Sequence, residues 1–312
     1  MHDSQLTHLK FLYLTEAFDH RAKLLQKTGR LGTFPSSRGQ EIFFLACAVA
    51  LNNTDWYCPY YRDHAALLYR GYPAHALFQY WAGDERGNIP LPPHTLPINV
   101  PIGSQTSHAT GVAMALAKTS NICLVTLGDG ASSKGEVYES INFAAIHSLP
   151  ILFAVNNNQY AISTPLNLQT ANLSIAEKFS NMGLETQSFN QPNHPEQIFS
   201  FIGNAAKQVR KNRAPLLIEV FSPRLDSHTT NDDASLYRTE QELSDEEKLC
   251  PIRLYEQHLL EKNYSPKELG AIKRNADNDI LEAQKYFLTL PKQTIDDLHS
   301  HLWASDHLGE SR

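Results

Sequence analysis

Two groups of residues that could bind a cation follow short apolar runs. Residues 122–127 form the first run, which ends at Gly128-Asp129-Gly130. Residues 151–155 form the second, which ends at Asn156-Asn157-Asn158. Both runs are typical of buried strands. A carboxylate and an amide oxygen at two strand ends are the hard oxygen ligands that Mg²⁺ prefers, and a diphosphate can supply further oxygens.

The segment between the runs predicts that the two groups meet. Residues 135–148 have the pattern of a helix, so the three elements form a βαβ unit with parallel strands. The carboxyl ends of such strands share one edge of the sheet, where open α/β folds bind ligands. The alternative is that Asp129 caps the following helix and the Asn run is a simple turn.

The residues around these strand ends resemble a known family. Gly-Asp-Gly followed by Asn157-Asn158 is similar to the motif of thiamine-diphosphate enzymes. Residues 128–135, 142–145 and 157–163 resemble the alpha subunit of the decarboxylating component of 2-oxo acid dehydrogenase complexes, and the match covers roughly residues 31–238. The resemblance implies oxidative decarboxylation of a 2-oxo acid with thiamine diphosphate and magnesium, followed by acyl transfer to a lipoyl-bearing acyltransferase core.

The resemblance implies a magnesium–diphosphate site. The matching magnesium ligands are the side chains of Asp129 and Asn158 and the backbone carbonyl of Tyr160. The backbone expected to approach the diphosphate has small residues near a helix start, namely Gly128, Gly130 and Ala131.

The resemblance also implies a basic side to this site. Tyr61-Arg62 matches a Tyr-Arg pair of the family, and the planar donor fork of Arg62 suits a diphosphate oxygen. Arg224 and His228 match a strand-end loop in which an Arg and a His approach the cofactor. His228 would bind diphosphate and, as the catalytic residue, assist proton or acyl transfer. An isolated His would favour a structural role, but residues 232–238 extend the match.

Ile102-Gly103 resembles the family segment that meets the aminopyrimidine ring of the cofactor. Backbone groups at Gly103 would bond the ring's amino group. Ile102 is either the apolar wedge that bends the cofactor or a plain core residue.

The order of elements predicts an α/β fold. Helices alternate with apolar strands, which favours a doubly wound, mostly parallel sheet flanked by helices, and the resemblance implies the thiamine-diphosphate-binding fold. We expect one structural domain with a helical N-terminal extension (residues 1–52), an α/β core (53–242) and a helical C-terminal extension (243–312). Five prolines make residues 83–101 a long loop that cannot be helix or central strand. Residues 163–193 are predicted as mostly loop, with a short helix near 175–179.

Composition excludes several classes of protein. A net charge of −6 and a pI near 6.1 give no support for nucleic-acid binding. No run of about 18 apolar residues predicts a membrane span, and the first residues lack the basic flank and apolar core of a secretory signal. The four cysteines form no CxxC pair, which indicates reduced thiols in a cytoplasmic protein.

The resemblance places one required group outside this chain. The family needs a Glu against the aminopyrimidine, and in its two-chain form the beta subunit supplies it. We therefore expect an obligate beta subunit, an alpha-2-beta-2 assembly and a cofactor at the interface. Residues 160–165 and 232–238 look closer to branched-chain enzymes, while pyruvate and acetoin remain alternatives. The chain departs from the family at a shorter loop over residues 94–102, at residues 188–193 and at Ser227, which concerns the substrate pocket more than the cofactor site.

Two further functions stay open from the sequence. A non-catalytic paralogue could bind the cofactor or only the partner, although it has no reason to keep the five matching polar residues, Arg62, Asp129, Asn158, Arg224 and His228. A magnesium-dependent nucleotide-binding module would need a Gly-x-x-x-x-Gly-Lys-Ser/Thr or Gly-x-Gly-x-x-Gly loop, which the sequence lacks.

Overall fold

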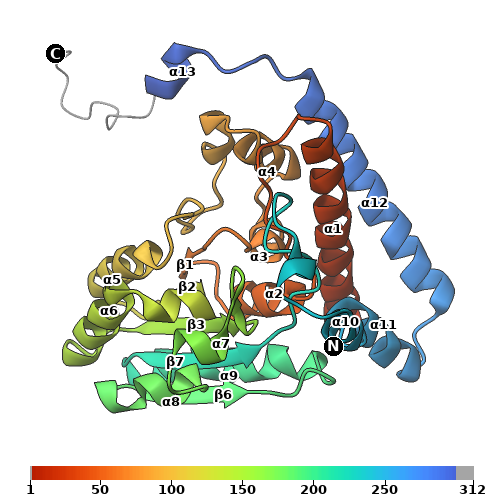
Figure 1. Ribbon diagram of the computed structural model, residues 1–312. Helices are drawn as coiled ribbons and strands as arrows, with labels where there is room; N and C mark the ends of the chain where they lie inside the picture. Colours follow the sequence, from red (N-terminus) through yellow and green to blue (C-terminus); the bar gives the residue numbers. More distant parts are fainter. Residues whose placement is uncertain (1, 300–312) are drawn as a thin grey trace.

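Parallel strands form the central sheet of the computed structural model, which describes residues 2–299 (Figure 1). The strand order is β1-β2-β3-β7-β6, and every neighbouring pair is parallel. In that order the strands are β1 (Trp56–Cys58), β2 (Cys123–Gly128), β3 (Ile151–Asn157), β7 (Leu216–Phe221) and β6 (Glu185–Phe189). The prediction of a doubly wound, mostly parallel sheet is therefore confirmed. A short antiparallel pair, β4 (Tyr160–Ala161) and β5 (Thr164–Pro165), stands apart from the sheet.

The sheet carries a separate hydrophobic core on each face because successive strand side chains point to opposite sides. Leu124 and Leu152 join one core, and their neighbours Val125 and Phe153 join the other. The central strands β2 and β3 are buried along almost their whole length. Burying each such side chain contributes about 1.5–3 kcal/mol, which explains why these strands are apolar without alternation.

Helices cover both faces of the sheet. The smaller core is closed by α5 (Ser104–Leu116), α6 (Gly135–Ile146) and α8 (Ile175–Phe179). Residues of the larger core come from α1 (His2–Lys27), α2 (Glu41–Val49), α3 (His64–Tyr69), α4 (Ala74–Trp81), α9 (Glu196–Asn212), α11 (Pro251–Glu261) and α12 (Pro266–Thr289). The long helices α1 and α12, from opposite ends of the chain, lie side by side (Figure 1).

The remaining elements are short. They are α7 (Leu166–Gln169), α10 (Glu240–Glu247), α13 (Ile295–His299) and the 3₁₀ helices η1 (Glu85–Asn88), η2 (Asp129–Ser133), η3 (Ser180–Met182) and η4 (Ala234–Leu236). No helix within residues 2–299 is long and apolar enough to cross a membrane. All four cysteines are buried thiols without a disulfide, as predicted.

Two sequence predictions about local structure were wrong. Residues 185–189 were expected in a loop but form edge strand β6, whose side chains are mostly polar and partly exposed. The proline-rich stretch 83–101 was expected to hold no helix, but η1 forms there because Asp84 accepts a hydrogen bond from the Arg86 amide and caps it. The rest of that stretch runs along the edge strand β1, where Tyr57 bridges Thr95.

Candidate active site

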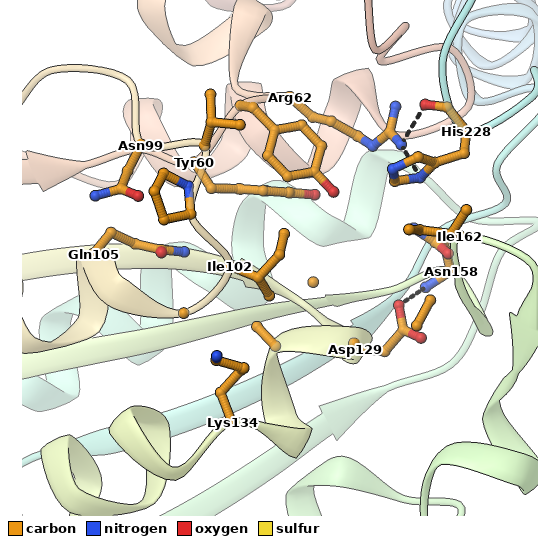
Figure 2. A pocket seen from close by; sticks show the side chains of 18 of the residues that line it. Tyr60, Arg62, Asn99, Ile102, Gln105, Asp129, Lys134, Asn158, Ile162 and His228 are labelled. Carbon is orange, nitrogen blue, oxygen red and sulfur yellow. Dashed lines mark hydrogen bonds between the residues drawn. The ribbon is translucent and has the colours of Figure 1, made fainter. Parts of the chain in front are cut away.

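A cavity of about 410 Å³ opens at the carboxyl edge of the sheet (Figure 2). It is formed by the segments that follow β1, β2, β3 and β7, together with the loop before α5. Every predicted site residue except Arg224 lines it: Tyr61, Arg62, Ile102, Gly103, Gly128, Asp129, Gly130, Ala131, Asn158, Tyr160 and His228. Residues far apart in sequence thus meet at one place because parallel strands end at one edge.

Asp129 and Asn158 form the acidic wall of the cavity. Asp129 opens η2 directly after β2 and is 1% exposed. Its Oδ1 accepts a hydrogen bond from the Asn158 backbone N–H at 3.4 Å, and its Oδ2 accepts one from Gln169 Nε2 at 3.1 Å. Burial raises the pKa of Asp129 above its ordinary value, so a nearby cation would stabilise the carboxylate strongly.

The side-chain amide of Asn158 has a defined orientation. Its Oδ1 accepts from the Tyr160 backbone N–H at 3.1 Å, so its Nδ2 must point the other way, where it donates to Gln40 Oε1 at 3.3 Å. Between Asn158 and Tyr160, Gln159 has a φ of +69°, a left-handed conformation that few residues other than glycine adopt. The turn therefore brings Asn158 and Tyr160 to the same wall of the cavity.

This donor set fits a hard cation shared with a ligand. Within residues 2–299 no group of three or more His, Cys, Asp or Glu side chains could hold a metal ion. Asp129 supplies a single carboxylate, and Asn158 and Tyr160 add neutral oxygens. Mg²⁺ typically binds through one or two carboxylates and takes its other oxygens from phosphates and water.

Arg62 and His228 form the basic wall. Figure 2 shows them above Asp129 and Asn158, with Ile162 between His228 and Asn158 in this view. Arg62 is 1% exposed, and its guanidinium donates to the Ser36 carbonyl at 2.6 Å and to the His228 carbonyl at 2.8 Å. Its Nη2 also lies 2.9 Å from His228 Nδ1. Since a guanidinium can only donate, Nδ1 must be the acceptor and the ring proton is on Nε2.

The His228 ring is neutral at physiological pH. Burial, followed by the positive charges of Arg62 and Arg224, lowers the pKa of His228 from 6.5 to about 3. Its backbone N–H donates to Asp232 Oδ2 at 2.7 Å, which fixes the loop that carries it. A neutral imidazole with its proton on Nε2 can donate that proton and later take one back.

Arg224 lies behind the cavity wall rather than on it. It is 1% exposed, and its guanidinium lies 5.6 Å from the ring centre of Tyr160 and 5.9 Å from that of Tyr237. Nη2 donates to the Ile162 carbonyl at 2.9 Å, but Nε and Nη1 are buried without a hydrogen-bond partner. Among the described residues neither Arg224 nor Arg62 pairs with a carboxylate within 4 Å. Two buried guanidinium groups without a carboxylate partner fit a site for an anion such as a diphosphate.

The loop before α5 supplies the third wall. Ile102 is 43% exposed and lines the cavity, so the alternative that it is a plain core residue is wrong. Gly103 has a φ of +85° and precedes α5, where a Cβ would meet Val137 Cγ2 at 3.2 Å. Its carbonyl already accepts from the amide and the hydroxyl of Thr106, at 3.0 and 2.6 Å. Gln105 lines the same wall and has a buried Oε1 without a hydrogen-bond partner, so it offers an acceptor there.

Sequence reasoning missed the amide side chains that hold the acidic wall in place. Gln40 precedes α2 and reaches Asn158 across 118 sequence positions. Gln169 ends α7 and bonds both Asp129 Oδ2 and the Thr164 carbonyl, at 3.1 and 2.9 Å. No local pattern of residues indicates either contact, because both depend on the folded path of the chain.

Comparison with known proteins identifies the family. A family model described as dehydrogenase E1 component matches residues 10–295. The chain is 36% identical over 265 residues to the pyruvate dehydrogenase E1 component subunit alpha of Mycoplasma genitalium, covering 84% of this chain and 74% of that relative. It is 37% identical over 258 residues to the 3-methyl-2-oxobutanoate dehydrogenase subunit alpha of Mycobacterium tuberculosis, covering 80% and 70%. It is 33% identical over 264 residues to the 2-oxoisovalerate dehydrogenase subunit alpha of Bacillus subtilis, covering 80% of each chain. These matches confirm the predicted resemblance, and the chain belongs to the dehydrogenase E1 component family of thiamine-diphosphate-dependent 2-oxo acid dehydrogenases.

Proposed function

We propose that this chain is the alpha subunit of a 2-oxo acid dehydrogenase and acts with a beta subunit in an alpha-2-beta-2 assembly. The main support for the proposal is that two polar walls face each other across one cavity. Asp129 and Asn158 offer oxygen ligands on one wall, and Arg62 and His228 offer donors on the other. The relatives named as alpha subunits support the same function.

In this proposal the chain holds the diphosphate end of the cofactor. Thiamine diphosphate supplies a cationic ring that takes up the electrons released when carbon dioxide leaves. Asp129, Asn158 and the Tyr160 carbonyl would hold Mg²⁺, and the guanidinium of Arg62 would bind a diphosphate oxygen. His228, with its proton on Nε2, would serve as the proton donor and acceptor during acyl transfer to a lipoyl arm.

A partner subunit would complete the cavity. Asp129 is the one acidic side chain on the wall formed by the described residues, so the Glu that the family requires is not among them. Three apolar side chains of this wall are exposed, Val100 at 49%, Ile102 at 43% and Ile162 at 54%. A beta subunit seated here would cover these side chains and supply the missing carboxylate.

The proposed substrate is a 2-oxo acid. The comparisons do not determine whether its side chain is that of pyruvate or that of a branched-chain acid. The preference for branched-chain acids rests on residues 160–165 and 232–238. Relatives named for pyruvate and for 3-methyl-2-oxobutanoate match with similar identity, 36% and 37%. We therefore propose both acids as substrates to be compared directly.

The test is turnover by the full chain purified with its co-purifying partner. Oxidation of pyruvate and of 2-oxoisovalerate would be followed with an artificial electron acceptor, with and without thiamine diphosphate and Mg²⁺. Asp129→Ala should abolish turnover and leave the assembly intact, while Asp245→Ala, at a side chain that is 54% exposed, should change neither. Absence of turnover with a stoichiometric partner and bound cofactor would favour the non-catalytic paralogue.

A further inference from the structure

Strand β7 carries one buried carboxylate among apolar neighbours. Glu219 is 7% exposed, and the other side chains of the strand are apolar: Leu216, Leu217, Ile218, Val220 and Phe221. Within residues 2–299 no Lys, Arg or His forms an ion pair with Glu219. Burying a carboxylate without a cation is costly unless neutral donors satisfy it. The positions of those donors therefore indicate what this residue does.

The carboxylate of Glu219 binds both ends of one segment. Its Oε1 accepts from Asn157 Nδ2 at 2.6 Å, where the segment leaves β3. Its Oε2 accepts from Ser174 Oγ at 3.1 Å and from the Ala176 backbone N–H at 2.9 Å, where the segment enters α8. Residues 157–176 form a loop that includes β4, β5 and α7 and carries much of the acidic wall of the cavity.

The bond to Glu219 also fixes the amide orientation of Asn157. A carboxylate can only accept, so Nδ2 must face Glu219 and Oδ1 must face away. That Oδ1 accepts from the backbone N–H of Gln159 at 3.0 Å and from its Nε2 at 2.9 Å. These two bonds hold Gln159 in its left-handed conformation. If the side-chain amide of Asn157 turned over, its NH₂ group would face the Gln159 N–H and both bonds would be lost.

Gln159 connects the two expected magnesium ligands that follow β3. Its unusual backbone conformation turns the chain between Asn158 and Tyr160, whose N–H then donates to Asn158 Oδ1. We propose that Glu219 is a positioning residue for the magnesium–diphosphate site, acting through Asn157 and the Gln159 turn, an inference that rests on the proposed function. Glu219 does not line the cavity, so it would not touch a cofactor bound there.

The test exchanges the donor and the acceptor of the Glu219–Asn157 bond. Glu219→Gln keeps the shape of the side chain, but its amide can satisfy only one side. Either its NH₂ group faces the NH₂ of Asn157, or its NH₂ group faces the Ala176 N–H and the bond to Ala176 is lost. The double variant Asn157→Asp with Glu219→Gln restores one donor and one acceptor, keeps the net charge, and leaves a carboxylate oxygen at position 157 for the Gln159 N–H. This reversal distinguishes the hydrogen bond from the mere presence of a buried charge.

The first readout is the Mg²⁺ concentration that half-saturates thiamine diphosphate binding by the full chain with its co-purified partner. Glu219→Gln should raise it about 10–100-fold, as loss of a hydrogen-bond partner that orients a metal ligand typically does, while kcat at saturating Mg²⁺ stays within about threefold. The double variant should return to within about threefold of the unaltered protein. Glu185→Gln, a matched change at an exposed side chain of neighbouring strand β6, should have no effect.

The second readout needs no cofactor. Hydrogen exchange of the free protein should show lost protection over residues 157–176 in Glu219→Gln and recovered protection in the double variant. Unchanged Mg²⁺ dependence in Glu219→Gln, or a folded double variant that recovers neither readout, would overturn the positioning role. If Glu219→Gln does not fold, the two readouts of the double variant alone decide whether Glu219 has the positioning role. If the unaltered protein itself shows no Mg²⁺-dependent binding, the proposed function fails and this inference with it.

Discussion

Replacing Arg62 by Met should weaken binding of thiamine diphosphate more than it lowers the free energy of unfolding. In the free protein the guanidinium donates to the Ser36 and His228 carbonyls and to His228 Nδ1. Losing these bonds to a charged donor costs about 1.5 kcal/mol each, the lower end of the range for such bonds. The variant also removes a buried charge without a carboxylate partner, whose desolvation costs several kcal/mol. The two effects offset each other, so the free energy of unfolding should change by less than about 1.5 kcal/mol.

In the cofactor-bound protein the same variant loses a charge-assisted bond to the diphosphate. Such bonds contribute about 1.5–3 kcal/mol, so the dissociation constant should rise about 10–150-fold. Calorimetric titration with thiamine diphosphate at saturating Mg²⁺ measures the affinity, and urea unfolding without cofactor measures stability.

Arg70→Met is the matched control for Arg62→Met. Arg70 follows α3, and its guanidinium is held in a similar way, by the carbonyl of Pro93 at 3.0 Å and the hydroxyl of Thr95 at 2.9 Å. It does not line the cavity, so Arg70→Met should leave the affinity unchanged. Unchanged affinity in Arg62→Met, or a loss of stability of about 4 kcal/mol or more with normal affinity, would refute the reasoning and make Arg62 a structural residue.

Two further predictions concern pH and the fold. The pKa of His228 is lowered from 6.5 to about 3 in the folded protein, so the folded state resists protonation and the free energy of unfolding should fall as pH drops from about 6.5 toward 3. His228→Gln should lose that part of the pH dependence in urea unfolding of the cofactor-free protein, and equal slopes for the two proteins would contradict the assignment. Asp55, which is fully buried, binds Arg210 Nη1 and Nη2 at 2.9 and 2.5 Å. Asp55→Asn should lower the free energy of unfolding by about 3 kcal/mol with no change in cofactor affinity, and weaker cofactor binding would show that its effect reaches the cavity.

The centre of the sheet was predictable from sequence, but its edges were not. Strands β2, β3 and β7 are buried on both faces, so their apolar runs identify them. The outer strands have one neighbour each. β6 keeps exposed and partly exposed polar residues, and β1 has three residues, too few to show a period.

The residues of the site also fall into two groups, those that the sequence predicted and those that it did not. Asp129 and Asn158 directly follow predicted strands, so the parallel topology was enough to place them on one wall. No motif in the sequence indicated a role in the site for Gln40, Gln169 or Glu219. Their roles follow from hydrogen bonds between distant segments, and hydrogen-bond direction is visible only once donors and acceptors have positions.

The electrostatics of the cavity link cofactor binding to stability. Arg62 and Arg224 are both buried, and the charge of each lowers the pKa of His228. Burial, together with the charge of Arg62, also lowers the pKa of Arg224. Burial and mutual repulsion of these positive charges therefore destabilise the free folded protein, and a bound diphosphate would remove that destabilisation. This gain adds to the affinity of the folded protein for an anion, whereas the unfolded chain, in which the charges are exposed to water, has no such gain. By linkage, an anion that binds the folded state alone stabilises it, and the stabilisation should be smaller in Arg62→Met than in Arg70→Met.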